Sequence, residues 1–191
     1  MDTSFEHGEV NDASPEPPLC VDLDGTIIAA DSLKVSLFQL GLTRPWRLPP
    51  LAFDTLRGRA WFKKRVADAI LPDPGRLPYR PAVLALLREE RQRGRRLIMV
   101  TAADQRVARL VADHLGIFDA VLGSDGRINL KGPRKLRAIQ QFLGSQEFDY
   151  MADDMADLVT LRAARRAFLV HPSRELLRAA QASCRVERVF E

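Results

Sequence analysis

The residues best suited to chemistry lie near the start of the chain, in the segment DLDGT at positions 22–26. This segment follows an apolar run, 19–21, which predicts a buried strand that leads into a glycine turn. Because side chains alternate along a strand, Asp22 and Asp24 should point to the same side. Carboxylates this close repel each other unless a cation lies between them, so the pair predicts a Mg²⁺ site, with one Asp as nucleophile and the other as proton carrier. The alternative is a solvated Asp-Gly turn.

Other polar residues follow later apolar runs of the chain. Thr101 follows such a run just before a helix start, Lys131 precedes another helix start, and Asp153 and Asp157 follow a third run. A hydroxyl, free helix amides and a Lys suit a phosphoryl group, and the acids suit a cation. Each residue also has a structural alternative: Thr101 as a helix cap, Lys131 as a solvated side chain with Lys135 as its rival, and the acids as charges at a helix N-terminus.

The elements that must position these residues alternate along the chain. Strands are expected at 19–23, 96–100, 118–122, 148–152 and 167–170. Helices are expected at 81–93, 104–115, 133–143 and 155–164. Short apolar strands that alternate with longer helices predict an α/β fold, a Rossmann-like parallel sheet with helices on both faces. In such folds ligands bind at the carboxyl ends of the strands, where all the candidate residues fall.

Three regions of the chain differ in composition. Residues 1–18 are polar and acidic, which predicts a disordered lead-in. Residues 32–78 contain helical patterns and no convincing strand, so they predict a small helical cap inserted after the first strand. The α/β core is then expected to comprise 19–31 and 79–191.

The ordered set of motifs resembles the haloacid dehalogenase-like (HAD) hydrolase superfamily over about residues 19–172. The resemblance implies that Asp22 attacks phosphorus to form an aspartyl-phosphate, while Asp24 protonates the leaving oxygen and then activates water. It implies that Thr101 and Lys131 bind the phosphoryl oxygens. It also implies a Mg²⁺ site made of Asp22, the carbonyl of Asp24, and Asp153, with Asp157 acting through water or as an orienting group.

The same resemblance implies a Mg²⁺-dependent phosphatase that hydrolyses a phosphate monoester. The alternatives are a phosphotransferase or other chemistry on the same intermediate, and a non-enzymatic basic binding module. The amino-acid sequences of several segments also resemble those of HAD domains fused to polyprenyl-transferase-type membrane proteins. One position departs from the family pattern, because Ala152 stands where members commonly have Gly before the last acidic motif, and Asp154 competes with Asp157 as the second metal-site acid.

The composition of the chain limits the classes of partner and the cellular compartment that we expect for the protein. The chain carries +4 overall, but five acids and no bases lie in residues 1–18, so 19–191 carries 29 bases against 20 acids, or +9. We expect a phosphorylated small-molecule or lipid-linked substrate and no nucleic acid. The basic, aromatic cap has two interpretations: an ordinary amphipathic cap with a packed inner face and a solvated basic outer face, or a face for peripheral contact with a membrane surface. The oligomeric state is left open. Neither a signal peptide nor a membrane-spanning run is visible, and Cys20 and Cys184 suggest no disulfide framework, so a cytoplasmic location is expected.

Overall fold

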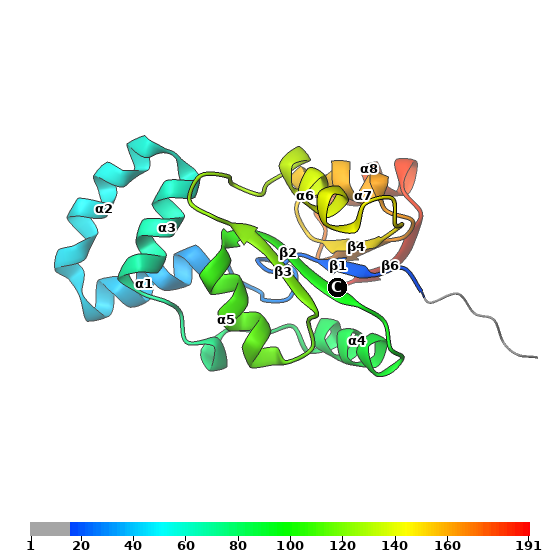
Figure 1. Ribbon diagram of the computed structural model, residues 1–191, viewed down its shortest axis with the longest axis horizontal. Helices are drawn as coiled ribbons and strands as arrows, with labels where there is room; N and C mark the ends of the chain where they lie inside the picture. Colours follow the sequence, from blue (N-terminus) through cyan, green and yellow to red (C-terminus); the bar gives the residue numbers. More distant parts are fainter. Residues whose placement is uncertain (1–15) are drawn as a thin grey trace, which may run out of the picture.

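A single sheet of six parallel strands forms the centre of the computed structural model, which describes residues 16–191 (Figure 1). The strand order is β3-β2-β1-β4-β5-β6. The strands are β1 (Leu19–Val21), β2 (Leu97–Asp104), β3 (Ala120–Ser124), β4 (Asp149–Ala152), β5 (Ala167–Val170) and β6 (Val186–Phe190). The order places β1 in the middle of the sheet, with β2 and β4 on either side of it. The residues that follow β1, β2 and β4 therefore meet at one edge of the sheet.

Helices cover both faces of this sheet, as Figure 1 shows. On one face lie α4 (Pro81–Gln92) and α5 (Gln105–Leu115), and on the other lie α6 (Pro133–Leu143), α7 (Leu158–Ala163) and α8 (Arg174–Ser183). Each face has its own apolar core: Leu19 and Val21 pack with α4 and α5, whereas Cys20 between them packs with α6 to α8. The period-two alternation of a strand buried on both faces explains this division. The predicted α/β architecture is confirmed.

The C-terminal pair α8 and β6 was not predicted from the sequence. The reason lies in the composition of β6, whose sequence VERVF places two charged residues inside an edge strand with only Phe190 buried. Edge strands need not be apolar on both faces, so they lack the continuous apolar run that marks the inner strands. The other strands and helices begin and end within a few residues of their predicted bounds.

Three helices follow the first strand and form the cap: α1 (Ser32–Thr43), α2 (Leu48–Asp54) and α3 (Arg59–Ala69). Short 3₁₀ turns at Pro45–Arg47 and Thr55–Arg57 connect them. Their small core is formed by Leu40, Leu51 and Val66. In Figure 1 the cap lies at one end of the molecule, and α3 is the cap helix that packs against the sheet, next to β2.

At the amino ends of the strands, a buried cluster of charges surrounds Asp149. This side chain is fully buried at the start of β4. Arg95 contacts Asp149, Arg165 donates to it at 3.0 Å, and Arg166 donates at 2.9 Å. Glu16 also pairs with Arg166, at 2.9 Å. Of the predicted lead-in, residues 1–15 lie outside the described residues, whereas Pro17 and Pro18 are described: their carbonyl oxygens accept hydrogen bonds from Arg95 at 2.8 Å and from the amide of Asp149 at 3.0 Å.

Candidate active site

Asp22 and Asp24 lie at the carboxyl end of β1, and both line the same cavity. Asp22 is buried, and its Oδ1 accepts a hydrogen bond from the amide of Leu23 at 2.8 Å. Asp24 is half-buried, and its Oδ1 accepts from the amide of Ser32, the first residue of α1, at 2.8 Å. Burial, together with the nearby charge of Asp22, raises the pKa of Asp24 to about 6. A carboxyl group with such a pKa can both donate and accept a proton near neutral pH.

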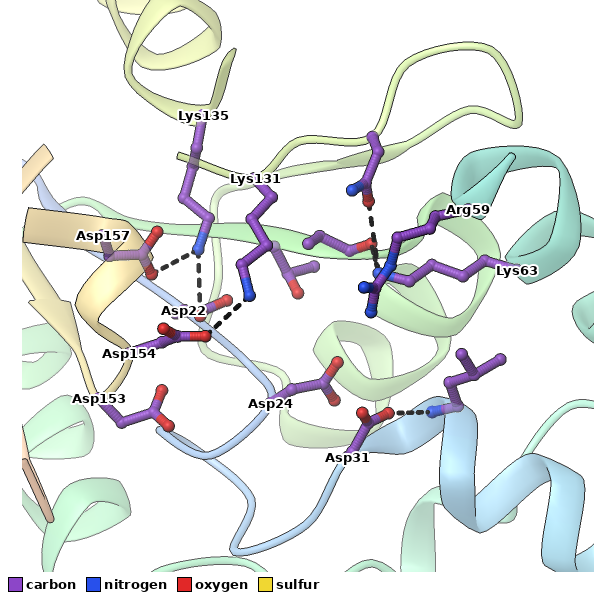
Figure 2. A pocket seen from close by; sticks show the side chains of 14 residues that line it. Asp22, Asp24, Asp31, Arg59, Lys63, Lys131, Lys135, Asp153, Asp154 and Asp157 are labelled. Atoms are coloured by element: carbon purple, nitrogen blue, oxygen red, sulfur yellow. Dashed lines mark hydrogen bonds and ion pairs between the residues drawn. The ribbon is translucent and has the colours of Figure 1, made fainter. Parts of the chain in front are cut away.

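Lys135, from the first turn of α6, is the cation closest to Asp22. Its Nζ lies 3.0 Å from Oδ2 of Asp22 and 2.8 Å from Oδ2 of Asp157, and only 2% of the side chain is exposed (Figure 2). The hydroxyl of Tyr150 donates to the same Asp157 oxygen at 3.1 Å. Burial would lower the pKa of Lys135, but the two carboxylates outweigh it and raise the pKa. Asp157 therefore holds the charged ammonium of Lys135 beside Asp22.

Lys131 occupies a different place. Its Nζ pairs with Oδ2 of Asp154 at 2.9 Å, and 47% of each side chain is exposed. Both residues line the cavity, but Figure 2 shows the Lys131 amine directed to Asp154 while Lys135 is directed to Asp22. Lys131 and Lys135 are four residues apart in sequence, and the sequence alone could not rank them.

Thr101 lies in the long strand β2, beside the end of β1. Regular pairing with β3 stops at Val100, so the backbone that follows is free to line the cavity. The side chain of Thr101 is fully buried, and its Oγ1 accepts from the amide of Ala103 at 3.1 Å. The hydroxyl proton remains available to an oxygen in the cavity. The helix start is at Gln105, where Asp104 caps α5.

Asp153 follows β4 on the side of the cavity away from the cap. Its Oδ1 accepts from the hydroxyl of Thr26 at 2.8 Å. Burial and the charge of Asp22 raise the pKa of Asp153 to about 6. Gly25, at φ +78°, permits this approach, because a Cβ at that position would lie 1.9 Å from Oδ2 of Asp153. Ala152 before it needs no such freedom, since His171 is the one non-glycine residue with positive φ among residues 16–191.

The donor set of the site fits a hard divalent cation. Among residues 16–191, no three His, Cys, Asp or Glu side chains form a ligand cluster by themselves. Mg²⁺ does not require one, because it usually takes one or two carboxylates and completes its shell with water and substrate phosphate. Asp22 and Asp153 face the same cavity, and the charge of Asp22 raises the cost of ionising Asp153, a cost that a cation between them would remove.

The cap closes the other side of the cavity. Arg59 and Lys63 of α3 line it, together with Asp31 and Leu33 (Figure 2). The space enclosed is about 120 Å³. The sequence predicts a basic cap but does not show which of its cations line the cavity. The i, i+4 spacing of Arg59 and Lys63 indicates only that the two residues share a face of the helix.

The chain is similar to several known proteins. The chain matches the family model of haloacid dehalogenase-like hydrolases over residues 19–162. The uncharacterized protein y4nM of Sinorhizobium fredii (strain NBRC 101917 / NGR234) is 41% identical over 153 residues, which cover 80% of this chain. The chain spans only 30% of the length of that relative. Nothing in these matches bears on the resemblance to domains fused to membrane proteins, which stays a prediction.

Solved structures share the fold at low identity. A protein of unknown function from Bordetella pertussis Tohama I superposes with a TM-score of 0.70 at 20% identity, covering 93% of this chain and 99% of that one. A phosphoserine phosphatase, solved as a phospho-aspartyl intermediate analogue, gives 0.59 at 12% identity, with 93% and 94% covered. A putative phosphoglycolate phosphatase from Lactobacillus delbrueckii subsp. bulgaricus ATCC BAA-365 gives 0.61 at 18% identity, with 93% and 95% covered. Since the family model covers most of the chain, the protein belongs to the haloacid dehalogenase-like hydrolases.

Proposed function

We propose that this protein is a Mg²⁺-dependent phosphatase that hydrolyses a phosphate monoester through an aspartyl-phosphate on Asp22. The observation that carries the proposal is the placement of Asp22. It is a buried carboxylate at a strand end, held 3.0 Å from a buried Lys and beside a second carboxyl group, Asp24, whose pKa burial raises to about 6. Structural neighbours described as phosphoserine and putative phosphoglycolate phosphatases add support through the shared fold.

The residues divide the reaction between them. Asp22 attacks phosphorus, and protonated Asp24 gives its proton to the leaving oxygen as the ester bond breaks. Asp24, now ionised, then takes a proton from the water that hydrolyses the aspartyl-phosphate. The hydroxyl of Thr101 donates to a phosphoryl oxygen throughout. A Mg²⁺ ion held by Asp22, Asp153 and the carbonyl of Asp24 would supply positive charge that offsets the charge on the phosphoryl oxygens.

We assign the phosphate-binding Lys to position 135. Lys135 is buried against Asp22, whereas Lys131 is half exposed and paired with Asp154. A cation fixed next to the nucleophile stabilises the charge that develops on phosphorus without having to reorganise. Asp157 then acts as a positioning residue for Lys135, and direct metal binding falls to Asp153 and Asp22.

The test is phosphate release from a panel of small phosphate esters, with Mg²⁺ and with EDTA, by the wild type and by Asp22→Asn. We expect turnover that requires Mg²⁺ and is lost in Asp22→Asn. Turnover that survives this substitution would refute Asp22 as nucleophile. Transfer of the phosphoryl group to an added alcohol in preference to water would favour the phosphotransferase alternative.

Contact of the cap with a membrane surface remains a separate proposal. Residues 32–71 contain eight bases and two acids, a net +6. Five large apolar side chains of the cap are between 69% and 87% exposed: Phe38, Leu42, Trp46, Phe53 and Leu56. No helix among residues 16–191 is long and apolar enough to cross a bilayer. Sedimentation with anionic and neutral liposomes at low salt tests the proposal, and equal recovery in the supernatant with both would contradict it.

A further inference from the structure

Two cations of the cap face the candidate active site across the cavity. Arg59 and Lys63 lie one helical turn apart on α3, so they share a face of that helix. Figure 2 shows both side chains entering the cavity from the cap side, opposite Asp153 and Asp154. They therefore lie where the leaving group of a phosphate ester bound at Asp22 would extend.

Lys63 is held in place by neutral oxygen atoms. Its Nζ donates to the carbonyl oxygen of Ala102, the residue after Thr101, at 2.6 Å, and to Oδ1 of Asn129 at 3.4 Å. An ammonium group has three N–H donors and no acceptor, so one donor remains for a ligand. These contacts fix the amine beside the part of β2 that carries the Thr101 hydroxyl.

Arg59 and Lys63 differ from the other basic residues of α3 in their partners. The other basic residues of α3 are paired: Lys64 with Asp68 at 3.2 Å and Arg65 with Asp54 at 3.2 Å. Among residues 16–191, neither Arg59 nor Lys63 has a carboxylate oxygen within 4.0 Å. Burial lowers the pKa of Lys63, and the carboxylates of Asp24 and Asp31 offset this only in part. Lys63 is half-buried and Arg59 is exposed, so the cost of a buried cation without a counter-ion falls on Lys63, and an anionic ligand would remove that cost.

We propose that Arg59 and Lys63 bind a second anionic group, a carboxylate or another phosphoryl, on the leaving group of the substrate. The proposal rests on the proposed phosphatase function and adds the class of its substrate. Arg59 and Lys63 line the same cavity of about 120 Å³ as Asp22. The two anionic groups of the substrate therefore lie a few bonds apart.

The kinetic test compares esters that differ only in the second anion. Phosphoglycolate, ethane-1,2-diyl bisphosphate and ethyl phosphate share a two-carbon leaving group that carries a carboxylate, a phosphoryl or no charge. We expect the wild type to favour an anionic ester over ethyl phosphate at least tenfold in kcat/KM, and the better of the two identifies the anion. Lys63→Gln should reduce this preference at least tenfold, mainly through KM, and Lys63→Arg should keep most of it.

Lys64→Gln is the matched control, since Lys64 is the adjacent basic residue of the same helix and pairs with Asp68 at the surface. The ratio of two substrates does not depend on the folded fraction, so poor folding of a variant cannot imitate the effect. Equal kcat/KM for charged and uncharged esters in the wild type, or an equal loss for both in Lys63→Gln, would overturn the subsite.

A binding measurement separates this proposal from the proposed function. Calorimetric titration of Asp22→Asn with phosphoglycolate and with ethyl phosphate needs no turnover. We expect phosphoglycolate to bind at least tenfold more tightly, and the added Lys63→Gln substitution to remove the difference. If no ester is hydrolysed by the wild type but this difference persists, the phosphatase proposal fails and the anion subsite stands. If esters are hydrolysed and the two ligands bind alike, the subsite alone fails.

Discussion

Buried aspartates lie at both ends of the sheet, but their pKa values are shifted in opposite directions at the two ends. At the amino ends, Asp149 is surrounded by Arg95, Arg165 and Arg166, which lower its pKa although burial opposes this. At the carboxyl ends, burial and mutual repulsion raise the pKa values of Asp24 and Asp153 to about 6. The difference lies in the supply of cations within contact distance.

This contrast separates residues that hold the fold together from residues kept for chemistry. A buried carboxylate with several guanidinium partners is satisfied within the protein and has no capacity left for a ligand. Carboxylates with raised pKa values carry an electrostatic cost that a metal ion and a phosphoryl group can relieve. The region of the sheet with the poorest internal neutralisation is therefore the region expected to bind.

The largest expected effect is the loss of activity in Asp24→Asn. Without the general acid, turnover of alkyl phosphates should fall by about 10²–10⁴-fold. An aryl ester such as 4-nitrophenyl phosphate needs little protonation of its leaving group. It should therefore still phosphorylate Asp22 and release a burst of nitrophenol equal to the enzyme concentration. A stopped-flow trace without this burst would contradict the dual role of Asp24. Urea unfolding should show no loss of stability, because a half-buried charge has been removed.

At the amino ends the same kind of substitution should affect stability instead. Asp149→Asn removes the buried counter-charge of Arg165 and Arg166 and one of the two buried partners of Arg95, which keeps Glu90 at 2.7 Å, so we expect the free energy of unfolding to fall by about 3 kcal/mol. Urea denaturation measures this loss, and kcat per folded molecule should be preserved. Asp154→Asn, which removes one exposed pair with Lys131, is the control and should cost less than about 1 kcal/mol. Equal losses in the two variants would refute the comparison.

Substitutions of Lys131 and Lys135 test which of the two lysines binds the phosphoryl group at the carboxyl ends of the strands. Lys135→Met should lower kcat/KM by about 100-fold, as expected for loss of a fixed charge at the reacting group. Lys131→Met should lower it by no more than about threefold, because the Lys131 amine is half exposed and paired with Asp154. Circular dichroism spectra of both variants show whether they fold. The reverse order of effects would return the phosphate-binding role to Lys131.

The smallest expected effect is a pH dependence of stability in the metal-free protein. The pKa values of Asp24 and Asp153 rise from 3.8 to about 6 on folding, so the native state holds more protons between these values. The free energy of unfolding should therefore fall as pH rises from about 4 to about 6, by roughly 1–2 kcal/mol after allowance for partial exposure. Asp149 contributes a pH dependence of the opposite sign. The arginines stabilise its ionised form, and this contribution to the free energy of unfolding is lost as pH falls below the ordinary pKa of the group.

Chemical denaturation at pH 4, 5, 6 and 7 in EDTA measures this slope, and the double variant Asp24→Asn/Asp153→Asn should reduce it to the part that comes from Asp157, whose pKa burial also raises. An unchanged slope in the double variant would mean that other groups produce it. Added Mg²⁺ should stabilise the wild type more at pH 7 than at pH 5, because protons compete with the cation for Asp153.

The sequence predicted the parallel sheet and the DLDGT turn because both depend on local patterns. A buried strand reads as an apolar run, and a carboxylate after it must lie at the strand end. The choice between Lys131 and Lys135 is not local. It depends on how α6 begins after Gly132, at φ +58°, and on which side of its first turn faces β4. The positions of Arg59 and Lys63 likewise depend on how α3 packs against β2, which composition does not reveal.

The hydrogen bond from the amide of Ser32 to Asp24 has a mechanical consequence. Ser32, the first residue of α1, holds the carboxyl group of Asp24 through this bond. A change in the orientation of α1 would therefore move the carboxyl group as well. This amide stabilises the ionised form of Asp24, and lengthening the bond would make the group a weaker acid. On the proposed mechanism, a displaced cap would thus change the pKa of the proton carrier as well as admit water, and we expect cleavage of the ester bond only while the cap is in place.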